Sequence, residues 1–458
     1  MDSLDKKYKV LSLFSGGLGL DLGIEATGRF EMIACIEKMP SFCNTIRLNQ
    51  NKGRLPKGLQ IIEGDISLLN PASVLKTLGI QAEEIDVIVG GPPCQSFSTA
   101  GKRGTTQDPR GTLLWDYLRF VEHIRPKFFL MENVRGLLSA ALKHRPIAER
   151  PEKDGAPLSE EEQPGSVVRL FAKELANIEG ASYHLDIYEV NCVNYGAPQI
   201  RERALFFGNR FDIKVDFPAP THGQRVAEPT EASQPALFDE PQLPDDSLLP
   251  WKTLGDVISD LNETNPTVLD FSPRKKSFLD LVPPGSNWRS LPEEIQKESM
   301  GKAWHAKGGR SGWWRRLTFD LPSPTLVTMP NHASTSLCHP TETRALSIRE
   351  YARIQEFPDE WEFSGTVTEQ YKQVGNAVPT RLGKVAGDLI AKNLDKIDRA
   401  GIMPSTATTW EPRIIYVQSH VRTRQWFKNG KVCVYDDEQL NGGTAYGKPK
   451  TTRKVKGL

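Results

Sequence analysis

Cys94 follows a segment of the chain that could hold a nucleophile in a fixed position. Apart from Asp86, residues 85–89 are apolar and β-branched, which predicts a buried strand. Pro92 and Pro93 lead from this strand to the cysteine. Open α/β sheets bind their ligands beyond the carboxyl ends of their strands, so Cys94 would stand at the ligand-binding edge. The prolines restrict the backbone, and a reacting group misplaced by about one ångström can lose roughly a hundredfold in rate.

The other five cysteines are scattered, with no Cys-x-x-Cys pair and no histidine spacing suited to zinc. We therefore predict free thiols and no metal site. A free cysteine is more often a small buried hydrophobe than a nucleophile, so context must single out Cys94. Gln95, Ser96 and Ser98 add polar groups that a buried cysteine does not need. Residues 101–111 are glycine-rich and basic, which fits either a mobile loop closing over a phosphate backbone or an ordinary surface loop.

A carboxylate and two arginines could work beside this cysteine. Glu132 stands just beyond the predicted strand 128–131 and is expected to neighbour Cys94, where it could stay protonated or share a proton with a ring nitrogen. Taken alone, it would be interpreted as a helix cap. Arg201 and Arg203 lie two apart on a predicted strand and so share a face, where they could hold a planar base's carbonyl oxygen and a nearby phosphate. The alternative for the arginines is a solvated edge strand.

A glycine-rich turn and two acids outline a second kind of site. The predicted strand 10–14 runs into the turn 15–23, whose glycines let a ligand approach the backbone at a helix start. Glu37 follows the next strand, where an acid normally grips ribose hydroxyls, and Asp65 is placed to accept from an adenine amino group. Each acid alone could instead cap a helix. Because no phosphate-binding glycine loop is present, the pattern favours an adenosine-bearing ligand without a phosphate chain, such as S-adenosylmethionine.

A parallel α/β sheet would bring these residues together. Short β-branched runs alternate with helical patterns in the first part of the chain, which predicts a doubly wound domain. The predicted strands are 10–14, 32–36, 85–89, 128–131, 185–190 and 204–207, and helices are predicted at 113–124 and 167–178.

Two stretches interrupt this pattern. Residues 145–166 are charged and contain prolines, which predicts a surface loop, and residues 219–250 are poor in core-forming side chains, which predicts a linker. A short helix at 251–261 and tryptophans among basic residues then indicate a second, irregular domain, and a last helix follows Asn376 through Ile390. We predict a catalytic domain of 1–210 plus 344–400, a second domain of 211–343, and an extension of 401–458.

The bulk composition limits the classes of function. Lys and Arg number 58 against 57 Asp and Glu over 458 residues, so any phosphate-binding surface must be local. No apolar run approaches a membrane span, and the start of the chain lacks the apolar core of a signal peptide. We expect a soluble cytoplasmic protein that works as a monomer and has no membrane partner.

The order of the motifs resembles that of the bacterial DNA cytosine C5-methyltransferases, the modification enzymes of restriction systems. The likeness covers the chain from about Lys9 to Leu389. In chain order the motifs are Phe14-Ser-Gly-Gly-Leu-Gly19, Glu37, Asp65, Gly91-Pro-Pro-Cys-Gln95, Glu132-Asn-Val134, Gln199-Ile-Arg-Glu-Arg203, Arg344-Ala-Leu-Ser-Ile-Arg-Glu350, Arg353-Ile-Gln-Glu-Phe-Pro358 and Gln373-Val-Gly-Asn-Ala-Val-Pro379. So many motifs in one order make coincidence negligible.

The resemblance implies a Rossmann-like S-adenosylmethionine-dependent methyltransferase domain with a smaller, irregular target-recognition domain. It implies that Cys94 adds to carbon 6 of cytosine while Glu132 contacts ring nitrogen 3 and the amino group. Arg203 would hold the carbonyl oxygen, with Arg201 beside it. Carbon 5 then takes the methyl group, a base removes the carbon 5 proton, and elimination frees Cys94. Because stacking shields carbons 5 and 6, the cytosine must be flipped out of the duplex, at a cost of about a few kcal/mol.

The resemblance also assigns the cofactor pocket, to which Asn376 returns from the far end of the chain. The residues assigned to it are Phe14, Ser15, Gly16, Gly17, Leu18, Gly19, Glu37, Asp65, Ile66, Pro93 and Asn376. The region 211–343 would read double-stranded DNA, and Arg310, Arg315 and Arg316 with the nearby tryptophans are compatible with groove contacts, although a tryptophan is more often core. A restriction endonuclease would be the functional counterpart without a stable complex, and the overall likeness is to enzymes that modify GGNCC-type palindromes.

Three other interpretations are weighed against this one. A catalytically silent relative could bind DNA or regulate a partner, but every reactive position is filled, and only a failure to methylate any duplex would revive it. The same chemistry could act on RNA, although the long region 211–343 favours sequence-specific duplex DNA. A nicotinamide-dependent oxidoreductase is the third, and a lack of spectral response to NADH would exclude it.

Overall fold

The computed structural model describes residues 6–93, 112–223, 248–305 and 312–405, and four short strands in the C-terminal region. Cys94, the loop 101–111, residues 224–247 and Arg310 lie outside the described residues. Within the described ranges, no helix is both long and apolar enough to cross a membrane.

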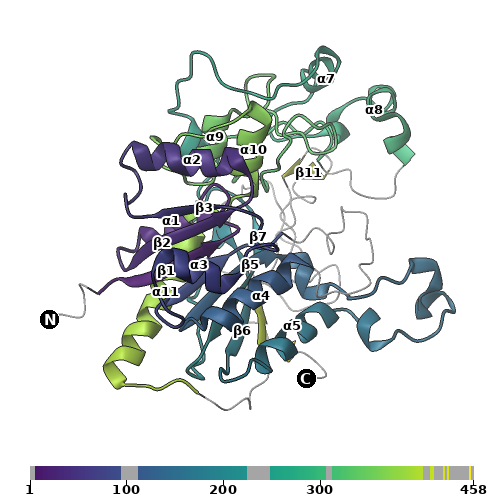
Figure 1. Cartoon of the computed structure of the whole chain (residues 1–458). Helices are drawn as coiled ribbons and strands as arrows, with labels where there is room; N and C mark the ends of the chain where they lie inside the picture. The colour runs from purple at the N-terminus through teal and green to yellow at the C-terminus, as the bar shows by residue number, and fades with distance from the viewer. Residues whose placement is uncertain are drawn as a thin grey trace.

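A mixed sheet runs through the centre of the molecule (Figure 1). Its strand order is β13-β10-β6-β7-β5-β4-β1-β2-β3. The strands are β1 (Tyr8–Leu13), β2 (Phe30–Glu37), β3 (Gln60–Glu63), β4 (Val87–Gly90), β5 (Phe128–Val134), β6 (His184–Asn191), β7 (Glu202–Asn209), β10 (Arg413–Tyr416) and β13 (Arg453–Lys454). Strand β7 is antiparallel to both β5 and β6, and β13 is antiparallel to β10, whereas the other pairs are parallel. All the strands predicted from the sequence are present.

Strand β1 is the point where the sheet order reverses, because β2 lies on one side of it and β4 on the other. In doubly wound sheets, ligands bind at the carboxyl ends of the strands that flank such a switch point. The turn after β1 and the Gly91-Pro92-Pro93 segment after β4 both leave the sheet here. The topology therefore places the two predicted sites beside one another.

Helices cover both faces of the sheet, because alternate strand residues point to opposite sides. On β4 and β5, Val89 and Leu130 belong to one hydrophobic core, and Ile88 and Phe129 belong to the other. Helices α1 (Gly19–Glu25), α9 (Ile348–Ile354), α10 (Val367–Asn376) and α11 (Thr380–Ala400) contribute to the first core. Helices α3 (Pro71–Leu78), α4 (Leu113–Ile124) and α5 (Ser166–Ala176) contribute to the second. The doubly wound arrangement is confirmed, but the sheet is mixed and not wholly parallel as predicted, because β7 runs against both of its neighbours. Helix α2 (Pro40–Asn51) connects β2 to β3.

Helix α11 crosses α1 at glycine positions that allow the two backbones to touch. A Cβ placed on Gly23 would lie 1.9 Å from the carbonyl oxygen of Thr380, and one on Gly383 would lie 2.2 Å from that of Leu20. Close packing of this kind is available only to glycine. The predicted final helix is present but begins later, at Thr380, and runs to Ala400. Through this contact with α1, helix α11 holds the C-terminal part of the domain close to the turn that follows β1.

A smaller unit has a hydrophobic core of its own. That core is made by Phe271, Phe278, Leu279, Val282, Trp288, Leu291, Met300, Trp314, Cys338 and Ala345. Its helices are α7 (Pro273–Leu279) and α8 (Glu293–Met300), with the 3-10 turns η7 (Trp288–Ser290) and η8 (Gly301–His305). By contrast, Phe211, Val215 and Leu254 pack into the core beside the sheet. The separate core begins at Phe271, later than the predicted range 211–343, and extends past its end to Ala345. The predicted helix 251–261 is shortened to α6 (Gly255–Ile258).

The prediction that Arg315 and Arg316 are available for groove contacts is wrong. Both are buried, at 6% and 5% exposure, and burial lowers the pKa of Arg315 to about 10. Arg316 donates to the carbonyl oxygens of Leu279 and Val282, so it links two segments within the small unit. Trp288 and Trp314 are also buried, which agrees with the core alternative for the tryptophans.

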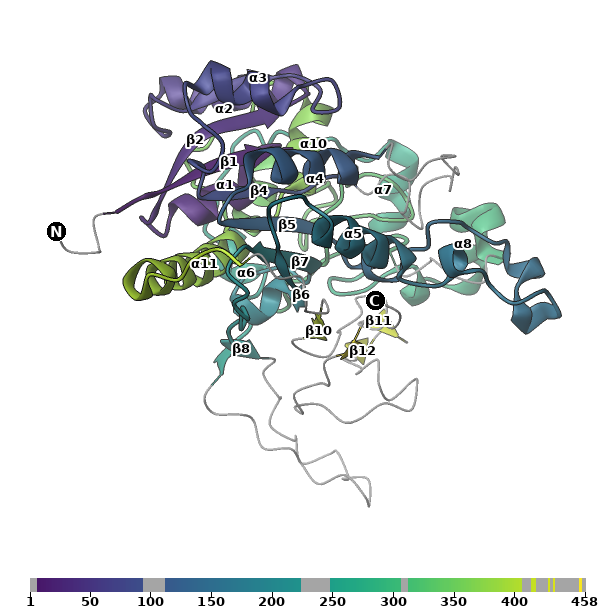
Figure 2. The same cartoon turned by 60° about the horizontal axis from the view of Figure 1, so that its bottom comes forward.

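Residues 145–166 form a projecting segment of short turns, visible at the right of both Figure 1 and Figure 2. Its turns are η3 (Ile147–Glu149), η4 (Pro151–Lys153) and η5 (Glu160–Glu162), and most of its side chains are exposed. This agrees with the predicted surface loop. The remaining short elements are η2 (Arg135–Ser139), η6 (Cys192–Tyr195), β8 (His222–Gly223), β9 (Leu249–Pro250), β11 (Phe427–Lys428) and β12 (Lys431–Val432).

Candidate active site

The exit of strand β4 is fixed by contacts from two neighbouring elements. The Tyr117 hydroxyl on α4 donates to the carbonyl oxygens of Ile88 and Leu130 at 3.2 and 3.1 Å, which bridges β4 and β5. Asn133 Nδ2, at the end of β5, donates to the Pro92 carbonyl oxygen at 3.0 Å. Asn133 was part of a motif quoted from the sequence, but its role was not predicted. It holds the chain two residues before Cys94.

Glu132 and Arg203 form an ion pair beside this exit. They come together because β5 and β7 are antiparallel neighbours with Val134 opposite Arg203. Both side chains are largely buried, at 13% and 10% exposure. A Cβ placed on Gly91 would lie 2.8 Å from Glu132 Oε2, so the carboxylate lies directly against the backbone three residues before Cys94. The structure thus brings together Glu132, Arg203 and the start of the proline segment.

Arg201 does not join this pair. Its guanidinium is 2% exposed and donates to the carbonyl oxygens of Leu326, Gly375 and Asn376. Burial, and next the charge of Arg203, lowers the pKa of Arg201 to about 9. The two arginines were expected to share a face and a task, but Arg201 precedes β7 and turns toward the end of α10. Its predicted place next to a base is not what the geometry favours.

The four cysteines in the described ranges are all free and buried: Cys35, Cys43, Cys192 and Cys338. Burial raises the pKa of each thiol, to about 12 for Cys43 and Cys192 and to about 11 for Cys338. A thiol with a raised pKa carries little thiolate at neutral pH and is a poor nucleophile. None of these four is therefore an alternative to Cys94.

The turn after β1 is held by Glu37. Three turn residues, Phe14, Gly16 and Leu18, adopt positive φ angles of 55°, 56° and 68°. Glu37 Oε2 accepts from the Gly16 amide at 2.8 Å, and Glu37 Oε1 accepts from the Met39 amide at 2.8 Å. The second contact lies just before α2, whose first turn has no side-chain cap, so Glu37 does not take the helix-capping role left open from the sequence. Each oxygen still has a lone pair for a ribose hydroxyl.

Asp65 lies at the end of the neighbouring strand, β3, whose Glu63 pairs in register with Glu37. Asp65 Oδ2 accepts from Lys38 Nζ at 2.6 Å, and Oδ1 accepts from the Ser67 hydroxyl at 2.7 Å. The Lys38 hydrogen bond, followed by those from Ser67, holds the pKa of Asp65 at about 2. Lys38 was not predicted from the sequence. Both carboxylate oxygens of Asp65 thus already accept hydrogen bonds, and its contact with an adenine stays a prediction.

The end of α10 closes the other side of the β1 turn. A Cβ on Gly17 would lie 3.6 Å from Gln373 Cβ, and one on Gly19 would lie 2.6 Å from the carbonyl oxygen of Val378. Asn376 lies between these contacts in the chain and is exposed. The segment around Asn376 thus returns to the glycine turn, and the part of Asn376 in a cofactor pocket stays a prediction. Of the other assigned residues, Ser15 and Ile66 are buried, and Pro93 is the last described residue before Cys94.

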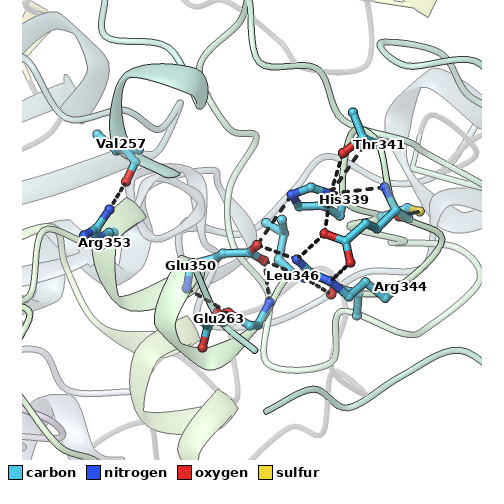
Figure 3. Close-up of polar contacts among 12 residues, drawn as sticks. Val257, Glu263, His339, Thr341, Arg344, Leu346, Glu350 and Arg353 are labelled. Carbon is cyan, nitrogen blue, oxygen red and sulfur yellow. Dashed lines mark hydrogen bonds and ion pairs between the residues drawn. The ribbon is translucent and has the colours of Figure 1, made fainter. Parts of the chain in front are cut away.

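Helix α9 joins the small unit to the core beside the sheet (Figure 3). Arg344 lies in the segment by which the chain leaves the small unit. It donates to both oxygens of the buried Glu350 on α9, at 2.8 and 2.9 Å. His339 Nδ1 accepts from the Thr341 and Glu342 amides, and burial lowers the pKa of His339. On the entering side, Arg353 of α9 donates to the Val257 carbonyl oxygen at 3.2 Å.

Residues 8–392 match the family of C-5 cytosine-specific DNA methylases. The chain is 37% identical over 396 residues to the type II methyltransferase M.Sau96I of Staphylococcus aureus, covering 86% of this chain and 78% of that one. It is 34% identical over 395 residues to the type II methyltransferase M.Eco47II of Escherichia coli, covering 86% and 81%. A solved E. coli structure described as a prophage-encoded DNA modification methyltransferase shares the fold, with a TM-score of 0.50, 24% identity, and coverage of 86% and 100%. The chain belongs to the C-5 cytosine-specific DNA methylase family.

Proposed function

We propose that this enzyme methylates carbon 5 of a flipped-out cytosine in double-stranded DNA by covalent catalysis through Cys94. The observation that carries the proposal is the buried Glu132–Arg203 pair, which lies against Gly91 at the exit of β4. An acid and a guanidinium held side by side offer complementary contacts to ring nitrogen 3 and the carbonyl oxygen of a cytosine. Cys94 follows Gly91 by three residues, on a segment that Asn133 holds in place.

In the proposed reaction the Cys94 thiolate adds to carbon 6, and Glu132 holds a proton at ring nitrogen 3, which makes carbon 5 nucleophilic. Bound S-adenosylmethionine would supply an electrophilic methyl group to that carbon and would leave as S-adenosylhomocysteine. Loss of the carbon 5 proton to a base and cleavage of the bond between sulfur and carbon 6 return Cys94 to the thiolate. Arg203 holds the carbonyl oxygen and keeps Glu132 oriented.

S-adenosylmethionine fits the residues around the β1 turn. Glu37 faces the Gly16 amide with oxygens that can also accept from ribose hydroxyls, and Asp65 offers an acceptor at the next strand end. Asn376 lies on the segment that packs on Gly17 and Gly19. We infer that these residues and the turn 14–19 hold the cofactor, with Ile66 and Pro93 beside them.

The small unit is the proposed reader of the DNA sequence, and the two curated relatives support a place in a type II restriction-modification system. The enzyme would protect host DNA from a cognate restriction endonuclease without forming a stable complex with it. GGNCC-type palindromes are the proposed class of target.

The test is to express the protein in a methylation-free host and map 5-methylcytosine by bisulfite sequencing. We expect methylation at one short motif, none with Cys94→Ala, and a loss in turnover of about a hundredfold or more with Glu132→Gln. Cys338→Ala is the matched control, because that buried thiol belongs to the core of the small unit and should leave methylation in place. Methylation by Cys94→Ala would refute the mechanism, and methyl transfer to tRNA but not to DNA would refute the substrate.

A further inference from the structure

The carboxyl end of helix α10 is held by two side chains that come from elsewhere in the chain. A helix leaves its last four carbonyl groups without partners inside the helix. Gln355 Nε2 donates to the carbonyl oxygens of Val374 and Ala377 at 2.7 and 3.0 Å. Arg201 Nη2 donates to those of Gly375 and Asn376 at 3.0 and 3.2 Å. Every carbonyl from 374 to 377 is thereby bound, and the Arg201 charge favours the negative end of the helix dipole.

The two capping side chains belong to one buried polar cluster. Gln199 Nε2 donates to Gln355 Oε1 at 3.1 Å, and Gln199 Oε1 accepts from the Leu326 amide at 3.0 Å. Arg201 also donates to the Leu326 carbonyl oxygen at 3.3 Å. Gln199 and Gln355 are fully buried, and Arg201 is 2% exposed. The amide groups of Gln199 and Gln355 and both terminal nitrogens of Arg201 have partners here, and Arg201 Nε has none among the described residues. Buried polar groups bonded in this way favour one arrangement of the elements that they join.

The capped segment faces the β1 turn directly. Gln373 and Val378, on either side of it, are the residues against which Gly17 and Gly19 pack. A Cβ on Gly375 would lie 2.9 Å from the backbone of Val327, so the segment has no room to shift on that side. Helices α9 and α10 lie side by side (Figure 1), which places Gln355 at the end of α9 against the end of α10. Displacement of the cap would therefore move Asn376 relative to the glycine turn.

We propose that Arg201 and Gln355 are positioning residues for the cofactor pocket, which fix Asn376 against the β1 turn, and that Arg201 does not contact the target base. This inference rests on the proposed function, because Asn376 is a cofactor residue only there. The inference assigns different roles to two arginines that lie only two residues apart in the sequence. Arg203 pairs with Glu132 at the reacting base, whereas Arg201 acts through the end of α10.

The test compares S-adenosylhomocysteine binding and turnover in the full chain. Calorimetric titration should show that Arg201→Met and Gln355→Met each weaken binding about tenfold, the equivalent of about 1.4 kcal/mol. In Gln355→Met the KM for S-adenosylmethionine should rise while kcat at saturation is retained. Arg201→Lys should recover part of the affinity, because an ammonium can still donate to both carbonyls. Arg203→Met is the matched control, and should lose turnover while keeping its affinity for S-adenosylhomocysteine.

Two results would overturn the inference. One is Arg201→Met behaving like Arg203→Met, with normal affinity and lost turnover. The other is a lower thermal midpoint in both capping variants with unchanged affinity, which would indicate a structural role alone. If Arg201→Met does not fold, Gln355→Met and Arg201→Lys carry the same comparison. Failure of the proposed pocket itself is distinct, because Glu37→Gln and Asn376→Ala would then also leave the affinity unchanged.

Discussion

Asp21 is a carboxyl group buried in helix α1, directly behind the β1 turn. It is 4% exposed, and its Oδ1 atom has no hydrogen-bond partner among the described residues. Burial raises its pKa from 3.8 to about 6, against a smaller opposing effect of Ser12. The unfolded chain therefore loses this proton at a lower pH than the folded chain. Folding stability falls as the pH rises between these two values, and the penalty is complete above pH 6.

We predict that Asp21→Asn stabilises the protein by about 3 kcal/mol near pH 8, and by about half of that near pH 5. Urea unfolding at the two pH values measures the difference. Asp388→Asn, at an exposed carboxylate on α11, should change stability little at either pH. A gain from Asp21→Asn that is independent of pH would contradict the assignment of burial as the cause.

Arg201 and Arg203 show how far residue types alone predict a site. Their spacing predicted one shared face, and the motif order assigned both to catalysis. The difference between them depends on what lies opposite: Glu132 from β5 for Arg203, and the end of α10 for Arg201. Those contacts span 71 and about 174 residues of chain, so only the tertiary structure reveals them. Glu132 itself was predictable because the apolar run 128–131 leads directly into it, although β5 extends through Val134 and so contains Glu132.

At the scale of elements, strands and helices with strong apolar patterns were predicted well. Helix α4 has the bounds predicted for it, and α5 differs by a residue or two. Strand β3 is absent from the predicted strands, because its four residues are partly exposed and half of them are polar. The burial of Arg315 and Arg316 was missed because carbonyl groups of the small unit's irregular backbone, not charges, satisfy them.

The crossing of α1 and α11 gives a prediction at this scale. Gly23→Ala would place a methyl group 1.9 Å from the Thr380 carbonyl oxygen, and backbone atoms cannot rotate away. We expect a loss of about 1–3 kcal/mol, from overpacking, and weaker S-adenosylhomocysteine binding, because α1 carries the β1 turn. Gly58→Ala is the control, since no atom lies within 4 Å and its φ is not positive. Thermal unfolding measures the stability of the two variants. Equal unfolding midpoints for Gly23→Ala and Gly58→Ala would show that the helices move apart without a loss of stability.

At the scale of the whole molecule, the contacts of α9 fix the position of the small unit on the catalytic core. Chain segments that enter and leave it both contact α9: the Thr267 carbonyl accepts from the Ile348 amide at 3.0 Å, and Arg344 pairs with Glu350. Glu350 also accepts from the Ser347 amide, at the start of the same helix. The short helix α9 thus contacts the segment that enters the small unit and the segment that leaves it (Figure 3). If the small unit reads DNA, these contacts set the direction from which DNA approaches Cys94.

We therefore predict that Glu350→Gln raises the KM for DNA while leaving the affinity for S-adenosylhomocysteine unchanged. The substitution leaves Arg344 largely buried without its charged partner on α9, which should lower the free energy of unfolding by about 3 kcal/mol. Glu293→Gln removes a carboxylate from an exposed pair on α8 in the same unit and should alter neither quantity. Steady-state kinetics with varied DNA, beside calorimetric titration of the cofactor product, separates the effects. A destabilised variant with an unchanged KM for DNA would mean that the α9 contacts support the fold but do not direct the DNA. Equal losses of affinity for DNA and for the cofactor product would mean that the small unit and the cofactor pocket do not respond independently.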